Sequence, residues 1–311
     1  MRYSEIENKL ELFLDELREQ EKADNTIKAY KEDITHFLRT SGEKAPEEEI
    51  TKDDILTYKS VMNKSGAATS TINRRIISIN KLLKWNGESD IATTHTIKQQ
   101  TNGNLDNVLS VSDYERLLRV ALNPTEQALK AGKKPDLQAW VIMQVLANTG
   151  IRFSELQFFT VENLKAASKS GNSITVDNKG KRRNIPITKD LEKLLTDYCK
   201  QKNIAEGYIF VTRNNTTISN EQISRRLKAI AGYARINKSK VHPHSFRHLF
   251  GKTYMQEIGR IDELADIMGH SNIQTTRIYS RTTGKEKADN ISSLGLLKKK
   301  AAPPRTKAKK K

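Results

Sequence analysis

The stretch that decides the fold class is SITVDNKGKRRNIPIT, residues 173–188. Apolar and polar residues alternate on both sides of a glycine turn, a pattern that is typical of a β-hairpin. Ile174 and Val176 on the first strand are expected to face inward, against Ile185 and Ile187 on the second. A second short strand is expected at 208–211, and the rest of the chain follows helical spacing. The sequence therefore predicts a mainly α-helical protein with one small sheet.

Upstream of the hairpin, residues 4–86 contain four segments with apolar residues at helical spacing. Thr51, followed three residues later by Asp54, predicts a capped start of the third helix. Cations lie between the apolar positions of the fourth helix and on a helix of the second domain. We take six of them as candidate DNA contacts: Arg74, Arg75, Lys81, Lys84, Arg225 and Arg226. A solvated helix face is the alternative explanation for these charges.

The helical pattern is interrupted once, over a polar stretch that separates two domains. We predict a helical domain at 1–86, a linker at 87–106 and a second domain at 107–297. Residues 298–311 form a basic tail that we expect to be disordered. Eight of these last fourteen residues are Lys or Arg, and none is acidic.

Composition excludes several classes of protein. Among the 311 residues, 36% are hydrophobic and 29% charged, and no apolar run reaches the roughly eighteen residues of a membrane span. The first twenty residues lack the apolar segment of a secretory signal. Cys199 is the one cysteine, which excludes an internal disulfide and a multi-cysteine metal site. We therefore expect a cytoplasmic protein.

The net charge of +17 indicates a polyanionic partner. A basic folded body with a basic tail is typical of proteins that bind nucleic acid. For the tail, charge that only keeps the protein in solution is the alternative.

Histidine and arginine are concentrated late in the chain, where VHPHSFRHLF covers residues 241–250. His244 and Arg247 are one helical turn apart and project from the same face. A zinc site from His244 and His248 would need a glutamate at position 245, which is Ser245. An ordinary structural histidine is the other alternative.

Two further motifs join this segment. In NTGIRFSEL, Arg152 follows a helix-ending glycine and Glu155 lies one turn along; in IMGHSNIQTTRIYSR, His270 follows Gly269 and precedes Tyr279 by nine residues. Each motif is weak by itself. Their order and spacing along the chain make the combination specific.

With these motifs in order, the chain resembles the tyrosine recombinase, or phage integrase, family over nearly its whole length. The resemblance implies a helical, SAM-like core-binding domain and a mixed α/β catalytic domain with a small antiparallel sheet. It also implies site-specific cleavage and rejoining of DNA through a 3′-phosphotyrosyl intermediate and a Holliday junction. No metal, ATP or other cofactor is expected.

The family's catalytic positions match seven residues here: Tyr279, Arg152, Lys179, His244, Arg247, His270 and Glu155. The resemblance makes Tyr279 the nucleophile, His244 its proton acceptor and Lys179 the acid that protonates the leaving 5′-oxygen, with Lys181 as a rival for that lysine. Paired guanidiniums can hold the nonbridging oxygens of a phosphate and stabilise the added charge of the transition state. His270 would donate to the scissile phosphate, and Glu155 would support the site.

The resemblance also implies partners: double-stranded DNA with inverted-repeat core sites, and a homo-tetramer on that DNA. Segment 285–297 is expected to dock onto a neighbouring subunit or to cap its own domain, and accessory proteins are an open question. Because the first helix begins near Ser4, we expect a two-domain enzyme. Its expected location is a prokaryotic cytoplasm, in association with the nucleoid. A chromosome-dimer resolvase of the Xer type and a mobile-element integrase both fit, and the alternatives are a non-catalytic DNA-binding protein of this fold or a type IB topoisomerase.

Overall fold

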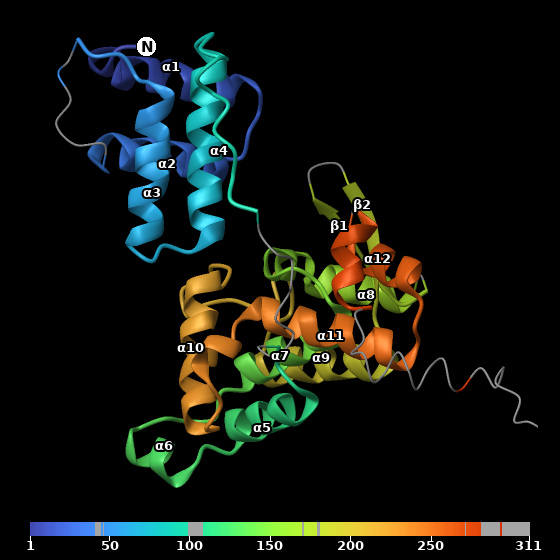
Figure 1. Cartoon of the computed structure of the whole chain (residues 1–311). Helices are drawn as coiled ribbons and strands as arrows, with labels where there is room; N and C mark the ends of the chain where they lie inside the picture. Colours follow the sequence, from blue (N-terminus) through green and yellow to red (C-terminus); the bar gives the residue numbers. More distant parts are fainter. Residues whose placement is uncertain are drawn as a thin grey trace, which may run out of the picture. The chain divides into compact units, whose positions relative to one another are not determined.

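The structure of the protein is a computed structural model that describes residues 1–40, 45, 47–98, 108–169, 171–178, 181–270, 272–280 and 293. The chain divides into two compact units, Met1–Asn102 and Gly103–Lys311, which are described separately below (Figure 1). Across the described ranges, no helix has the length and apolar character needed to cross a membrane. The predicted tail at 298–311 and the predicted docking segment at 285–297, apart from Ser293, lie outside the described residues.

The N-terminal unit contains the four predicted helices. They are α1 (Ile6–Glu19), α2 (Asp24–Thr40), α3 (Lys52–Lys64) and α4 (Thr69–Trp85). The expected cap of α3 is confirmed: the Thr51 side chain accepts from the Asp54 amide, and the Asp54 carboxylate accepts from the Thr51 amide. Their apolar stripes form one core, in which Leu14, Ile76 and Leu83 are fully buried.

The C-terminal unit is mainly helical, with one hairpin at its edge near α12 and α8 (Figure 1). Its helices are α5 (Val111–Leu122), α6 (Glu126–Lys130), α7 (Leu137–Thr149), α8 (Val161–Lys169), α9 (Lys189–Lys202), α10 (Asn220–Tyr233), α11 (Pro243–Glu257) and α12 (Ile261–Met268). Short 3-10 turns lie at Phe153–Phe158, Lys238–Lys240 and Ile273–Ile278. A large core joins α5 and α7–α11 to the hairpin, whereas α12 belongs to a smaller cluster with Tyr279 and also packs against the second strand.

The hairpin consists of β1 (Ser173–Asn178) and β2 (Lys181–Pro186), which pair antiparallel. Ile174 lies opposite Ile185 and Val176 lies opposite Arg183, while Ile187 lies beyond the paired residues, so the two predicted apolar pairs face each other only in part. The strand at 208–211 is also wrong, because the backbone there makes only isolated bridges to two separate partners, Thr160 and Thr217. The register places an arginine at an inward position of the hairpin.

Helices α7 and α11 pack against each other and set the geometry of the later motifs. Gly150 ends α7 in the left-handed region, with φ of 61°. An added Cβ at Gly150 would collide with the ring of Phe250 on α11. Both the backbone conformation and the close approach of α11 therefore require glycine at this position.

Replacing Gly150 with alanine is expected to lower the free energy of unfolding of the C-terminal unit by about 3 kcal/mol, from left-handed strain and the Phe250 collision together. Gly132 is a matched control, because its φ is 70° and no atom lies within 4 Å of an added Cβ. Gly132→Ala should cost only about 1 kcal/mol. Urea unfolding in a Trp85→Phe background measures both variants, since the remaining tryptophan, Trp140, lies on α7. Equal losses in the two variants would contradict the packing argument.

Candidate active site

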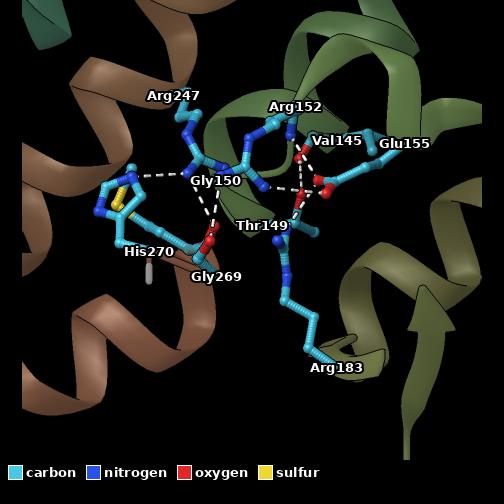
Figure 2. A network of polar contacts seen from close by, with 10 residues as sticks. Val145, Thr149, Gly150, Arg152, Glu155, Arg183, Arg247, Gly269 and His270 are labelled. Atoms are coloured by element: carbon cyan, nitrogen blue, oxygen red, sulfur yellow. Dashed lines mark hydrogen bonds and ion pairs between the residues drawn. The ribbon is translucent and has the colours of Figure 1, made fainter. Parts of the chain in front are cut away.

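Arg152 follows the end of α7 and is held by Glu155 and by a distant carbonyl. The Arg152 amide donates to Glu155 Oε2 at 2.7 Å, and its Nη1 pairs with Glu155 Oε1 at 3.3 Å. Its Nη2 donates to the Gly269 carbonyl at 3.0 Å (Figure 2). The Arg152 side chain is 43% exposed, whereas Glu155 is fully buried. The guanidinium is thus fixed at its base and open to solvent.

Arg247 lies on α11 with only 1% of its surface exposed. Its Nη1 donates to the Gly150 carbonyl, and its Nη2 donates to the Met268 carbonyl at 2.7 Å. Figure 2 shows the Arg247 and Arg152 guanidiniums side by side, with Gly150 and Gly269 beneath them. Burial, followed by the charge of Arg152, lowers the pKa of Arg247 to about 10, so the side chain remains protonated at neutral pH.

His270 follows the left-handed Gly269 that ends α12. Its Nε2 lies 2.8 Å from Arg247 Nη2, and its Nδ1 lies 2.8 Å from Thr276 Oγ1. Because a guanidinium only donates, Nε2 accepts and the proton of the neutral ring lies on Nδ1. His270 therefore lies beside Arg247, and in this tautomer both of its ring nitrogens already have partners within the protein.

Tyr279 lies at the end of the Ile273–Ile278 turn and is 7% exposed. Its hydroxyl is 2.8 Å from His248 Nδ1. The ring packs over Gly251 of α11, where an added Cβ would come within 2.8 Å of Tyr279 Cζ. Burial raises the pKa of Tyr279 to about 12, an effect that the positive charge of Arg247 partly opposes. The hydroxyl is therefore protonated at neutral pH and can donate to His248.

His248 is the tyrosine's hydrogen-bond partner, whereas the sequence pointed to His244. The two imidazole rings are neighbours, with centroids 4.4 Å apart, and His244 is the more exposed. Burial lowers the pKa of His248 to about 4, so that ring is neutral at neutral pH and can accept the hydrogen bond that the tyrosine hydroxyl donates. Of the two hairpin candidates, Lys179 lies outside the described residues. Lys181 begins β2, and its side chain also lies outside the description.

Two residues of the site were missed by the motifs: His248 and Arg183. Arg183 Nη2 pairs with Glu155 Oε2 at 2.7 Å, so the buried carboxylate is shared by two arginines (Figure 2). A signal for Arg183 was available in the alternation of β2, where it shares the inward face with Ile185. His248 follows His244 by one helical turn, which places both on one face.

Acidification is expected to destabilise the C-terminal unit through His248 and His270. Burial lowers both pKa values from 6.5 to about 4. The unfolded chain binds these protons below pH 6.5 and the folded chain only near pH 4, so stability is complete above pH 6.5 and declines between those values. We expect a melting temperature about 5 °C lower at pH 5 than at pH 7. His248→Gln should reduce this difference, and a melting temperature independent of pH would contradict the assignment.

The predicted DNA contacts of the N-terminal unit differ in exposure. The Arg74 guanidinium is half exposed and pairs with the buried Asp33 at 2.7 Å. Arg75 is 17% exposed and contacts both Asp33 and His36 Nε2, at 3.7 and 2.9 Å. Lys81 lies over the Tyr30 ring. Arg74, Lys81 and the exposed Lys84 therefore remain candidates for a phosphate, whereas Arg75 is engaged within its own unit.

The two arginines of α10 also divide. Arg225 is exposed. Arg226 is held by both carboxylate oxygens of Asp136 and donates to Gln138 Oε1 at 2.6 Å. Arg226 thus anchors α10 to the start of α7, and Arg225 is the member of the pair that a ligand can reach.

Known protein families match both units of the chain. Residues 107–286 match the phage integrase family, and residues 10–87 match the phage integrase N-terminal SAM-like domain. The chain belongs to the phage integrase family. The matches place α1–α4 in the SAM-like domain and the arginine cluster with Tyr279 in the integrase domain.

Relatives within the phage integrase family include several Xer proteins. Tyrosine recombinase XerD of Oceanobacillus iheyensis is 26% identical over 294 residues, which cover 89% of this chain and 95% of that protein. XerC of Herpetosiphon aurantiacus is 28% identical and covers 89% and 92%. XerA of Pyrococcus furiosus is 26% identical and covers 93% and 94%.

Solved integrase structures share the fold. The Tn1549 transposon integrase bound to circular intermediate DNA is 17% identical, with a TM-score of 0.68 over 92% of this chain and 99% of that one. XerH bound to difH is 18% identical, with a TM-score of 0.67 over 93% and 84%. A lambda integrase dimer on a core site is 16% identical, with a TM-score of 0.69 over 90% and 96%.

Proposed function

We propose that this protein is a site-specific recombinase that cleaves and rejoins double-stranded DNA through a 3′-phosphotyrosyl intermediate. The observation that carries the proposal is the pair of adjacent guanidiniums, Arg152 and Arg247. Arg152 donates to the Gly269 carbonyl, and Arg247 contacts the next residue, His270. The Tyr279 hydroxyl contacts His248 on α11, the helix that carries Arg247. Two adjacent guanidiniums suit the nonbridging oxygens of a phosphodiester and the charge that develops in its transition state.

In the proposed cleavage step, Tyr279 Oη forms a bond to the scissile phosphorus and the bond from phosphorus to the 5′-oxygen breaks. The tyrosine proton passes first to His248 Nδ1, its partner at 2.8 Å, with the adjacent His244 as the next site along α11. Because the pKa of Tyr279 is about 12 and that of His248 about 4, the proton leaves the hydroxyl as the bond to phosphorus forms and not before it.

The leaving 5′-oxygen takes a proton in the same step, and we assign that acid to the hairpin lysine, Lys179 or its rival Lys181. The phosphotyrosyl bond then conserves the energy of the phosphodiester, and attack by a 5′-hydroxyl reverses the reaction. Under this proposal neither a metal ion nor ATP takes part.

Strand exchange through a Holliday junction would require two DNA duplexes and a homo-tetramer. The relatives' names, tyrosine recombinases XerD and XerC, support an Xer-type role, and the Tn1549 fold neighbour is a transposon integrase. We propose the same strand-exchange reaction, on inverted-repeat core sites, for either of these two roles. The exposed Arg74, Lys81, Lys84 and Arg225 are the proposed contacts with DNA.

The test is the capture of a covalent adduct on a selected site. A duplex that the full chain binds is selected from a random-sequence library and is synthesised with a nick beside each candidate scissile position. The short strand then diffuses away after cleavage and the adduct accumulates. We expect a denaturant-resistant adduct in chelator without ATP, and mass spectrometry of its peptides should place the nucleotide on Tyr279.

The alternatives give different results in the same experiment. Tight binding of the selected duplex without an adduct at any nick position would favour a non-catalytic DNA-binding protein. Relaxation of supercoiled plasmid that lacks the selected site would favour a type IB topoisomerase. An adduct that requires a divalent metal would contradict the proposed mechanism.

A further inference from the structure

Arg183 occupies an unusual place for a charged side chain. It lies at an inward position of β2, opposite Val176, and its side chain is 14% exposed. Burial lowers the pKa of this guanidinium, and the charge and hydrogen bond of Glu155 oppose that shift only in part. No described residue accepts a hydrogen bond from its buried Nε. A largely buried charge lowers the stability of the fold unless its ion pairs and hydrogen bonds compensate for the lost hydration.

The contacts of Arg183 converge on the two groups that hold Arg152. Arg183 Nη2 binds Glu155 Oε2 at 2.7 Å, and this same oxygen accepts from the Arg152 amide. Arg183 also packs under Gly269, where an added Cβ would come within 2.9 Å of its Cζ. The Gly269 carbonyl is the acceptor of Arg152 Nη2.

The balance of charge gives these contacts a consequence. Glu155 is fully buried and lies between two guanidiniums. Without Arg183, the carboxylate would draw Arg152 more strongly toward itself, because a buried anion requires compensation. The Arg152 guanidinium would then be less available to an anion in solvent.

We propose that Arg183 is a positioning residue that keeps Arg152 directed at the scissile phosphate by sharing Glu155 and supporting the Gly269 turn. This inference rests on the proposed recombinase reaction. Arg183 itself does not touch the phosphate, since its Nη2 is bound to Glu155 and its guanidinium lies under Gly269.

The test measures single-turnover adduct formation by the full chain at saturating protein, on the nicked duplex selected above. Arg183→Met should slow cleavage about 30-fold, as small displacements of a catalytic group do, with no change in DNA affinity. Arg182→Met is the matched control, because Arg182 is the adjacent residue of β2 and is 79% exposed. Arg182→Met should cleave at the wild-type rate when protein is saturating.

Two readouts separate positioning from a general structural defect. If Arg183 acts through Arg152, the double variant Arg152→Met/Arg183→Met should be no slower than Arg152→Met. A methylphosphonate at the scissile position has no charge on its nonbridging oxygen, so it needs the guanidiniums less. The Arg183→Met defect should therefore largely disappear on that substrate.

Arg183→Lys keeps a positive charge beside Glu155 but loses the planar, forked guanidinium. This variant replaces Arg183→Met in the test if thermal melting shows that Arg183→Met is unfolded. It should be slow on the phosphate substrate and near wild type on methylphosphonate. Wild-type cleavage by either variant, multiplicative defects in the double variant or an undiminished defect on methylphosphonate would overturn the proposal. Absence of an adduct with the wild-type chain would instead contradict the recombinase function.

Discussion

Tyr279→Phe is expected to abolish the covalent adduct while leaving DNA binding intact. The substitution removes the hydroxyl that lies 2.8 Å from His248 and keeps the ring that packs over Gly251. Loss of one hydrogen bond changes stability by only about 1 kcal/mol, so the fold should survive. Denaturing gels of the variant with the selected nicked duplex measure the adduct, and binding is measured on the same duplex.

Tyr254→Phe is the control for this result. Tyr254 packs against the same small apolar cluster as Tyr279, on α11. Its variant loses a hydroxyl from the same region and should form the adduct at the wild-type rate. An adduct that persists in Tyr279→Phe would show that another residue is the nucleophile.

Arg247→Met is expected to reduce single-turnover cleavage by about 10³-fold, because it removes a preorganised charge from the transition state. Methionine is flexible and of similar length, so it can fill the space that the buried arginine leaves. The Gly150 and Met268 carbonyls lose their donor, which should cost about 1–3 kcal/mol for each carbonyl left unpaired. A lower melting temperature should therefore accompany the loss of cleavage.

Arg260→Met is the matched control for Arg247→Met. Arg260 is 75% exposed and pairs only within its own turn, with Glu263 at 3.3 Å among the described contacts. Its variant should change neither cleavage nor melting temperature measurably, because exposed pairs contribute little to stability. Cleavage by Arg247→Met within tenfold of the wild type would contradict a role for Arg247 in phosphate stabilisation.

The mainly helical fold with its hairpin was predictable because it depends on local patterns. Apolar spacing located α1–α4, and alternation located β1 and β2. The register of the hairpin was less predictable: Val176 lies opposite Arg183, and an inward arginine breaks the apolar pattern that guided the prediction. Its compensation is Glu155, which precedes it by 28 residues and which no local pattern connects to it.

The motifs predicted Arg152, Arg247, His270 and Tyr279 as one site, and the structure brings Arg152, Arg247 and His270 together, with Tyr279 packed on the helix that carries Arg247. The hydrogen-bond partner of Tyr279 could not be predicted from the motifs. His244 and His248 share a helix face, and the choice between them depends on how the Ile273–Ile278 turn seats Tyr279 against α11. Such a choice is made by tertiary packing and is absent from the motif itself.

The predicted DNA contacts show that the exposure of a cation is equally hard to predict from the sequence. The sequence cannot distinguish an arginine that faces solvent from one whose side chain is largely covered and held by an acid of its own unit. Arg75 shares Asp33 with Arg74, and Arg226 is held by Asp136, although each has an exposed arginine beside it in the sequence. The acids that occupy them lie 42 and 90 residues away in the chain.

The glycine-capped ends of α7 and α12 have a consequence for how this site could change. Both helices direct the negative poles of their macrodipoles, through the carbonyls of Gly150, Met268 and Gly269, at the two guanidiniums. Main-chain atoms thereby offset part of the repulsion between the cations. Because these acceptors are backbone groups, substitutions on the outer faces of α7 and α12 leave them in place. Exchange of exposed residues on these helices is therefore compatible with keeping the backbone acceptors that hold the two guanidiniums.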